Sequence, residues 1–209
     1  MLNFSECTLI KLDDMFGLEI LDDNPILQNW LTGQVEINDF EERTLYVYQE
    51  VLKRYVHDWY EIELLQHFIG PMFTLVNFSS KKFGIFSERY LEGVVDDITL
   101  KGNPDGMIAS GFRQPKKPYF CFQEYKKHRD PHGDPAGQGL AAMLVGQEMN
   151  GYKHPLYGCY VIGADWYFMV LEGKMYSISS AYVATREDIF NIFRILKCLK
   201  QIIIRLVEE

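Results

Sequence analysis

The residues best suited to chemistry lie in two short stretches, "GNPDG" at positions 102–106 and "YFCFQEYKKH" at positions 119–128. The second stretch has the pattern of an aromatic strand that ends in Glu124 and Lys126. Because side chains alternate faces along a strand, residues 120, 122, 124 and 126 are expected on one face. A carboxylate and an amine that extend an apolar face are costly without partners. Asp105, at the mouth of another predicted strand, is the expected partner.

Asp105 and Glu124 on adjacent strands would suit a hard divalent cation, because Mg²⁺ takes oxygen ligands and keeps several waters. Lys126 beside them could orient or help to deprotonate an attacking water, or stabilise the charge that develops on a phosphate. We therefore expect a Mg²⁺ site, in which Mn²⁺ could substitute.

Helices and strands alternate along the chain in an order that would position these residues. Helical spacing predicts two helices between residues 40 and 76 with a break near Trp59, a helix over 137–150 and a closing helix over 186–207. Residues 83–110 predict two or three strands, 118–126 a further strand, and 156–182 a three-stranded meander. This order favours an α/β fold with helices packed on a mixed sheet.

The sequence "PD" at Pro104–Asp105, followed by "EYK" at Glu124–Lys126, resembles the signature of the PD-(D/E)XK nuclease superfamily. The resemblance implies a restriction-endonuclease-like fold in which Asp105 and Glu124 bind Mg²⁺. It also implies that the backbone carbonyl of Tyr125 adds a ligand and that Lys126 serves the water. The helix that starts "QGLAAM" is similar to the helix after the motif in several nuclease branches, so Gln138 is expected to face the site.

The stretch "YEIELLQHFIGPMF" resembles the opening helix of nuclease domains in type I restriction subunits and in related bacterial proteins. A glutamate on that helix commonly reaches the metal, and helical geometry favours Glu61, which shares a side with Leu65, Phe68 and Met72. Glu63, on the opposite side, remains the alternative. The resemblance covers about residues 58–180. We expect a nuclease-like domain over residues 41–209, preceded by an acidic N-terminal extension over residues 1–40 with one short helix.

These features predict a metal-dependent nuclease that hydrolyses phosphodiester bonds, with DNA favoured over RNA as substrate. The alternative is a binding or regulatory module that keeps the nuclease fold without turnover. Each residue also has an ordinary structural interpretation. Asp105 could belong to a plain "NPDG" turn, and Glu124 and Lys126 could form a weak ion pair at a solvated strand end. Glu61 could be a solvated carboxylate at a helix edge, and Gln138 could be an ordinary helix residue.

Charge is unevenly distributed over the 209 residues, whose formal net charge is −8. Residues 1–63 hold four Lys or Arg against fourteen Asp or Glu, whereas residues 101–140 hold seven against four. The overall charge argues against a protein that coats DNA generally. The basic part supplies candidate phosphate contacts that are expected to flank the site, with a solvated basic face as the alternative: Lys116, Lys117, Lys127 and Arg129.

The remaining patterns concern location and assembly. The acidic first thirty residues and the short apolar runs predict neither a signal peptide nor a membrane span, and four widely spaced cysteines suggest reduced thiols in the cytoplasm. The loop "HRDPHGDP" could be a metal cluster of His128, Asp130, His132 and Asp134, but its prolines favour a mobile loop. The closing helix is expected to pack in the core and to leave room for a homodimer contact.

Overall fold

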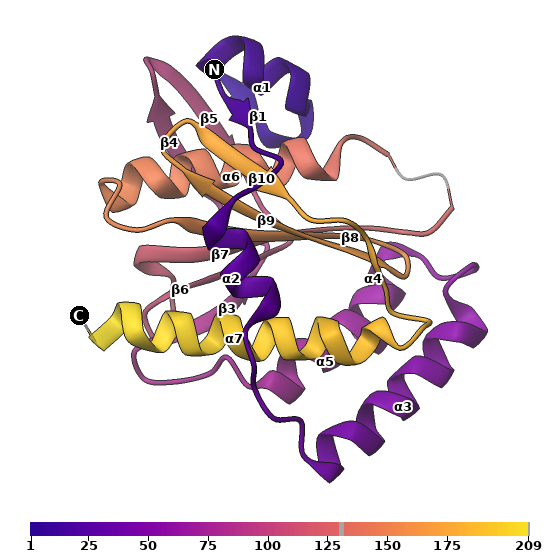
Figure 1. Ribbon diagram of the computed structural model, residues 1–209. Coiled ribbons are helices and arrows are strands. Elements are labelled where there is room, and N and C mark those ends of the chain that lie inside the picture. Colours follow the sequence, from indigo (N-terminus) through magenta and orange to yellow (C-terminus); the bar gives the residue numbers. More distant parts are fainter. Residues whose placement is uncertain (130–131, 209) are drawn as a thin grey trace.

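The computed structural model describes residues 1–129 and 132–208. A mixed sheet forms the middle layer and helices cover both of its faces, which confirms the predicted α/β arrangement (Figure 1). The strands of this sheet are β2 (Glu19–Ile20), β3 (Phe83–Ser87), β6 (Gly106–Ser110), β7 (Lys116–Lys126), β8 (Leu156–Ile162), β9 (Asp165–Glu172), β10 (Met175–Ile178) and β11 (Tyr182–Val183).

The strands follow the spatial order β2-β10-β9-β8-β7-β6-β3, and β11 pairs with β9. Strands β8, β9 and β10 form the predicted antiparallel meander. Strands β7 and β8 run parallel, which requires a crossover, and the helix predicted between them provides it. The long central strand β7 therefore has β6 on one side and β8 on the other.

One face of the sheet is covered by four helices, α2 (Pro25–Thr32), α3 (Asp39–Tyr55), α5 (Gly70–Val76) and α7 (Asp188–Glu208). The apolar side of α7 is buried, as predicted, and the indole Nε1 of Trp30 on α2 donates to the Ile195 carbonyl at 2.9 Å. The apolar face of α7 thus packs against other elements of the same chain. A homodimer through this helix stays a prediction.

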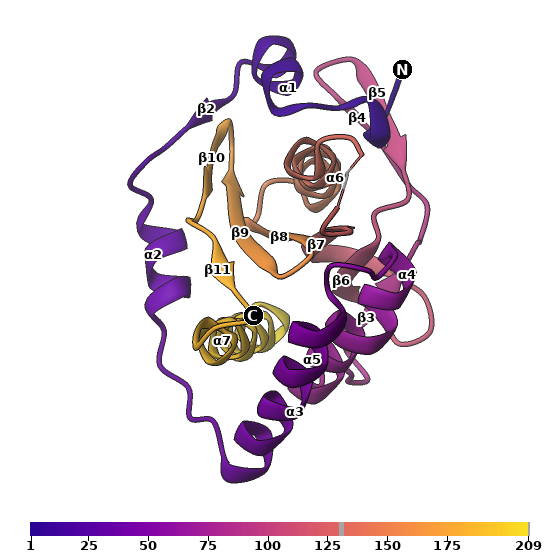
Figure 2. The same ribbon diagram turned by 90° about the vertical axis from the view of Figure 1, so that its right-hand side faces the viewer.

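The opposite face is covered by α6 (Pro135–Asn150), which is buried along nearly its whole length. Figure 2 shows α6 enclosed between the main sheet and a small sheet of β1 (Leu2–Asn3), β5 (Ile98–Gly102) and β4 (Leu91–Val95). Glycines permit this close packing. A Cβ on Gly146 would lie 2.5 Å from the Phe122 ring, and one on Gly93 would lie 2.7 Å from Val145. Residues 83–110 thus hold four strands, where the sequence predicts two or three.

Residues 1–40 form two helices, α1 (Leu9–Phe16) and α2, a 3₁₀ turn η1 (Phe4–Glu6) and two short strands, where the sequence predicts one short helix. Strand β1 pairs with β5, and β2 pairs with β10. The backbone of Cys7 and Thr8 lies so close to α6 that a Cβ on Gly137 would approach to 2.6 Å. The N-terminal segment is therefore built into both sheets. The boundary predicted at residue 40 stays a prediction.

The predicted break near Trp59 is confirmed, because α3 ends at Tyr55 and the next helical stretch begins at Glu61. That stretch consists of α4 (Glu61–Leu64), a π-helical turn η2 (Leu65–Ile69) and α5. π-helical turns inside α-helices are often found at functional sites. Within the described residues, no helix combines the length and the apolar character needed to cross a membrane.

Candidate functional site

Asp105 and Glu124 face each other across the β6–β7 pair. The register pairs Gly106 with Gln123, so the preceding residue Asp105 lies opposite Glu124, and opposed residues of an antiparallel pair point to the same side. The Tyr125 backbone N–H donates to Asp105 Oδ2 at 2.6 Å, and the backbone N–H of Asp105 faces the Glu124 carboxylate. We call Asp105 and Glu124 the carboxylate pair.

Glu124 lies against α6, on the same face as Phe122. A Cβ on Gly139 of α6 would lie 3.8 Å from Glu124 Cγ, so the helix leaves space beside this side chain. The predicted alignment of residues 120, 122, 124 and 126 is wrong for Phe120, which packs in the core on the opposite face. The register between β6 and β7 shifts here, since Ile108 pairs with Cys121 and Ala109 with Tyr119. This bulge inserts one residue and reverses the alternation.

Burial dominates the electrostatics of the carboxylate pair, and the charge of Asp105 adds repulsion at Glu124. Glu124 is only 3% exposed, and burial together with the charge of Asp105 raises its pKa well above the usual range, against the opposing effect of Lys126. Burial also raises the pKa of Asp105. The hydrogen bond from Tyr125 and the charge of Lys126 oppose this shift, and Glu61 and Glu88 add to it. A cation at this position would relieve the repulsion.

Lys126 ends β7 and is 9% exposed, which is unusual for a lysine. Alternation from Phe122 and Glu124 puts it on the α6 face, and its charge acts on both carboxylates. Within the described residues it forms no ion pair with a carboxylate. The amine is therefore close enough to influence the carboxylate pair without being locked to either member.

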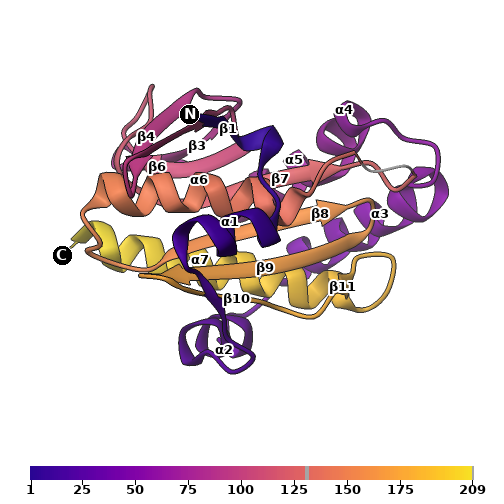
Figure 3. The ribbon, with the colours of Figure 1, turned by 90° about the horizontal axis from the view of Figure 1, so that it is seen from above.

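Glu61 approaches the carboxylate pair from α4. Seen from above, α4 lies at the end of the sheet at which β7 ends and α6 begins (Figure 3). Glu61, Ile62 and Leu65 line a hollow of about 170 Å³ together with Asp105, Tyr125 and Glu88; we call this the edge hollow. Glu63 faces elsewhere, because its carboxylate accepts from the Tyr60 N–H at 2.8 Å and caps α4.

Glu88 is the carboxylate that the sequence reasoning missed. It follows β3, and its backbone N–H donates to the Asp105 carbonyl at 3.2 Å, which fixes it beside the edge hollow. Its backbone φ of 51° is uncommon for a residue other than glycine. The available signal was its position within residues 83–110, where two or three strands are predicted, but only the pairing of β3 with β6 identifies Asp105 as its neighbour.

The other predicted site residues divide between the two ends of β7. Lys127 and Arg129 follow the strand on the side of the carboxylate pair, where Lys127 Nζ lies 6.0 Å from the centre of the Tyr60 ring. Lys116 and Lys117 begin the strand, and the eight residues from Lys117 to Glu124 span roughly 20 Å. The expectation that these two lysines flank the site is therefore wrong, because the strand is too long.

Gln138 lies in the first turn of α6 and is 9% exposed. Its amide Nε2 is close to Gly133, at which a Cβ would approach to 2.5 Å. The sheet-facing stripe of α6 contains Gly139, Met143 and Gly146, and Gln138 is turned about 100° from Gly139. Its side chain thus lies at the correct end of the helix but beside the stripe that contacts Glu124.

The donor atoms of the carboxylate pair suit a hard cation. Two carboxylates and the Tyr125 carbonyl are oxygen donors, and Mg²⁺ commonly takes one or two carboxylates and completes its shell with water. Within residues 1–129 and 132–208, no three or more His, Cys, Asp or Glu side chains are grouped to hold a metal ion. Of the alternative cluster in the loop, Asp134 caps α6 by accepting from the Gly137 N–H at 3.0 Å, and Asp130 lies outside the described residues.

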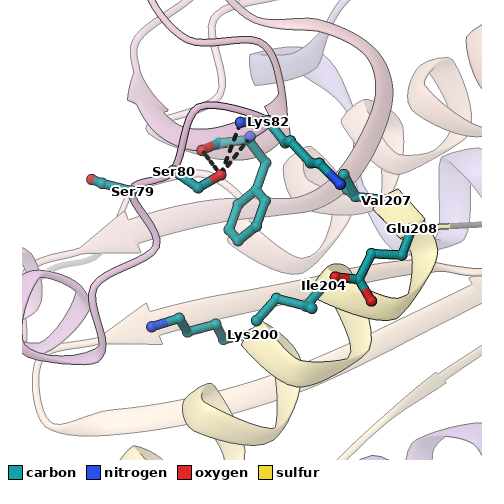
Figure 4. Close-up of a pocket in the computed structure, with 8 residues that line it drawn as sticks. Ser79, Ser80, Lys82, Lys200, Ile204, Val207 and Glu208 are labelled. Carbon is teal, nitrogen blue, oxygen red and sulfur yellow. Dashed lines mark hydrogen bonds between the residues drawn. The ribbon is translucent and has the colours of Figure 1, made fainter.

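A separate hollow of about 240 Å³ lies where the end of α7 meets the loop before β3 (Figure 4). Ser80 organises that loop, because its Oγ accepts from the backbone N–H groups of Lys82 and Phe83. Lys82, Lys200 and Glu208 contribute charged side chains to the lining. None of the residues predicted to carry chemistry lines this hollow.

Comparison with protein-family models and with curated proteins finds no match to this chain. Any function proposed for this chain therefore rests on the carboxylate pair, Lys126 and the residues of the edge hollow.

Proposed function

We propose that the chain is a divalent-cation-dependent nuclease of the PD-(D/E)XK superfamily, with a restriction-endonuclease-like core. One observation carries the proposal: Asp105 and Glu124 lie opposite each other on neighbouring strands, and Lys126 follows on the same face. This arrangement supports the proposal, because the superfamily signature requires an acid followed along the chain by a second acid and a lysine. The superfamily, the activity and the nucleic-acid substrate are all part of the proposal.

In this proposal Asp105, Glu124 and the Tyr125 carbonyl hold Mg²⁺. When bound, Mg²⁺ supplies positive charge to a phosphodiester oxygen and lowers the pKa of water. Lys126 donates hydrogen bonds to the attacking water or to a phosphate oxygen, and so orients the reactants. The Tyr125 N–H keeps Asp105 in place through its hydrogen bond to Oδ2. Glu61 and Glu88, on the rim of the edge hollow, orient waters at the exposed side.

The test compares purified protein and its variants on single-stranded DNA, duplex DNA and RNA, with Mg²⁺ or Mn²⁺. Asp105→Asn is preferred to alanine, because an amide oxygen still accepts from the Tyr125 N–H while the charge is removed. We expect Asp105→Asn and Lys126→Ala each to slow cleavage by about 100-fold or more. Asp97→Asn, in the exposed turn between β4 and β5, is the matched control and should cleave normally.

Two results would contradict the proposal. Cleavage by Asp105→Asn at the rate of the unaltered protein would remove the carboxylate pair from the chemistry. Absence of cleavage on all three substrates, while Mn²⁺ still binds and Glu124→Gln abolishes that binding, would favour the module without turnover.

A further inference from the structure

Three aromatic rings form a continuous surface beside α4. Tyr55 at the end of α3 stacks on Trp59 with centroids 5.9 Å apart and planes at 22°, and Trp59 lies 5.6 Å from the His67 ring at 34°. We call these three residues the aromatic slot. They line an open hollow of about 410 Å³ that Val51, Asp58 and Glu63 complete. Tyr55 and His67 are exposed and Trp59 is half-buried, so part of this aromatic surface is open to solvent.

The aromatic slot and the edge hollow lie close together. Trp59 precedes Glu61 by two residues, so their Cα atoms are separated by no more than about 7 Å. The segment after β7 connects the two places, since Lys127 lies over Tyr60 and Arg129 Nη1 approaches Asp58 Oδ1 at 3.7 Å. Glu61 lines the edge hollow and Glu63 lines the hollow of the aromatic slot, so a chain molecule that passes the carboxylate pair would reach the slot by crossing α4.

The charges around the aromatic slot indicate which part of such a molecule it accepts. The carboxylates of Asp58 and Glu63 line the hollow and would repel a phosphate. They would accept hydrogen bonds from the amino groups that adenine, cytosine and guanine carry on their edges. Aromatic faces stack on every base, whatever its identity. Lys127 lies over Tyr60 and Arg129 lies beside Asp58 at the rim of the hollow, so phosphates next to the bound base would pass these two cations.

We propose that the aromatic slot binds an unpaired nucleobase of the strand whose phosphate lies at the carboxylate pair, so that the substrate is single-stranded nucleic acid. This inference rests on the proposed nuclease function. A base inside a duplex is stacked on both faces and paired along its edge, so it cannot enter the slot without leaving the helix.

Tryptophan fluorescence provides a direct test. The chain has three tryptophans, and Trp30 and Trp166 are at most 1% exposed, so Trp59 alone can stack on an added base. A short single-stranded DNA oligonucleotide, titrated in the presence of a chelator to prevent cleavage, should quench the fluorescence of the protein. The blunt duplex of the same sequence should not, and an RNA oligonucleotide should quench as DNA does.

Variants measure the contribution of stacking. We expect Tyr55→Ala and Trp59→Ala each to weaken binding of the single strand by about 5- to 100-fold, as measured by the anisotropy of a labelled oligonucleotide. Trp59→Phe keeps a ring, so it should retain binding within a few-fold while the quenching disappears. Phe112→Ala, an exposed aromatic residue in the β6–β7 loop at the other end of β7, is the control and should bind normally.

The outcomes separate the slot from the nuclease activity. Unchanged binding by Tyr55→Ala and Trp59→Ala, or single-strand binding without quenching, would overturn the slot and leave the nuclease proposal intact. If the unaltered protein shows quenching that Trp59→Phe loses, but cleaves no substrate, the nuclease proposal would be refuted and the slot would remain as a binding site. Equal quenching by the duplex would overturn the preference for unpaired bases.

Discussion

Glu124→Gln should make the metal-free protein more stable while it removes the proposed metal site. Glu124 is 3% exposed and lies beside a second carboxylate, so its ionised form is both desolvated and repelled. Glutamine has nearly the same shape and can still accept from the backbone N–H of Asp105. The substitution therefore removes an unfavourable charge without opening a cavity.

The sign of the pH dependence follows from the direction of the pKa shift. Glu124 has a higher pKa in the folded protein than its ordinary value of 4.5, so the folded chain holds this proton more tightly than the unfolded chain does. The stability of the unaltered protein is then greatest below about pH 4.5 with respect to this group, and it falls as the pH rises toward the folded pKa. Each unit of difference corresponds to about 1.4 kcal/mol.

The expected gain at pH 8 is about 1–3 kcal/mol, the range that a buried polar group without adequate partners costs. For a chain of this length each kcal/mol shifts Tm by about 2–4 °C, so the variant should melt about 2–12 °C higher. Added Mn²⁺ at about 100 times its Kd should stabilise the unaltered protein by about 2.7 kcal/mol, and this gain should vanish in the variant.

Thermal and urea denaturation from about pH 5 to about pH 8, with and without Mn²⁺, measure both effects. Glu50→Gln is the control. Glu50 is exposed on α3 and, among the residues that the structure describes, pairs only with Lys53, so the stability of this variant should change by less than about 0.5 kcal/mol. A metal-free Glu124→Gln protein that is less stable than the unaltered one at pH 8, with an unchanged slope against pH, would refute the assignment of Glu124 as a destabilising charge.

Two further predictions concern packing and charge. Gly146→Ala should destabilise the protein by about 1–3 kcal/mol, because the new Cβ would approach the Phe122 ring to 2.5 Å. In Gly139→Ala the new Cβ would lie 3.8 Å from Glu124, so stability should change by less than about 1 kcal/mol. Urea denaturation measures both variants. Lys127→Ala should weaken oligonucleotide binding and reduce its salt dependence, whereas Lys117→Ala should leave both unchanged in a salt titration by anisotropy; equal effects would contradict the placement of the site at one end of β7.

The local pattern was sufficient to predict the carboxylate pair. The strand that ends in Glu124 and the turn before Gly106 are both encoded within a few residues, and they bring Asp105 and Glu124 to the same end of neighbouring strands. Helix boundaries at the break near Trp59 are equally local. These elements were predictable because turn residues and apolar periodicity act over short distances along the chain.

Features that depend on distant pairing were not predictable in this way. The bulge that turns Phe120 to the opposite face arises from the fit of β7 against β6, and Glu88 reaches the site only through the β3–β6 register. The parallel pairing of β1 with β5 and of β2 with β10 gives the N-terminal segment its structure. Lys116 lies far from the carboxylate pair for a simpler reason, because β7 separates the two ends of the basic stretch.

The fold requires a hydrogen-bond acceptor at Asp105 and at Glu124, but it does not require a negative charge at either position. The Tyr125 N–H needs an acceptor, and Asp105 supplies it just before β6 begins, but an asparagine would satisfy the same donor. The backbone N–H of Asp105 likewise faces Glu124, but this donor does not explain why an almost wholly buried residue beside a second acid carries a charge. A glutamine at this position would avoid both the desolvation and the repulsion. The negative charge at position 124 therefore lowers the stability of the metal-free folded chain. A cation that binds only the folded chain would neutralise this charge and stabilise the fold.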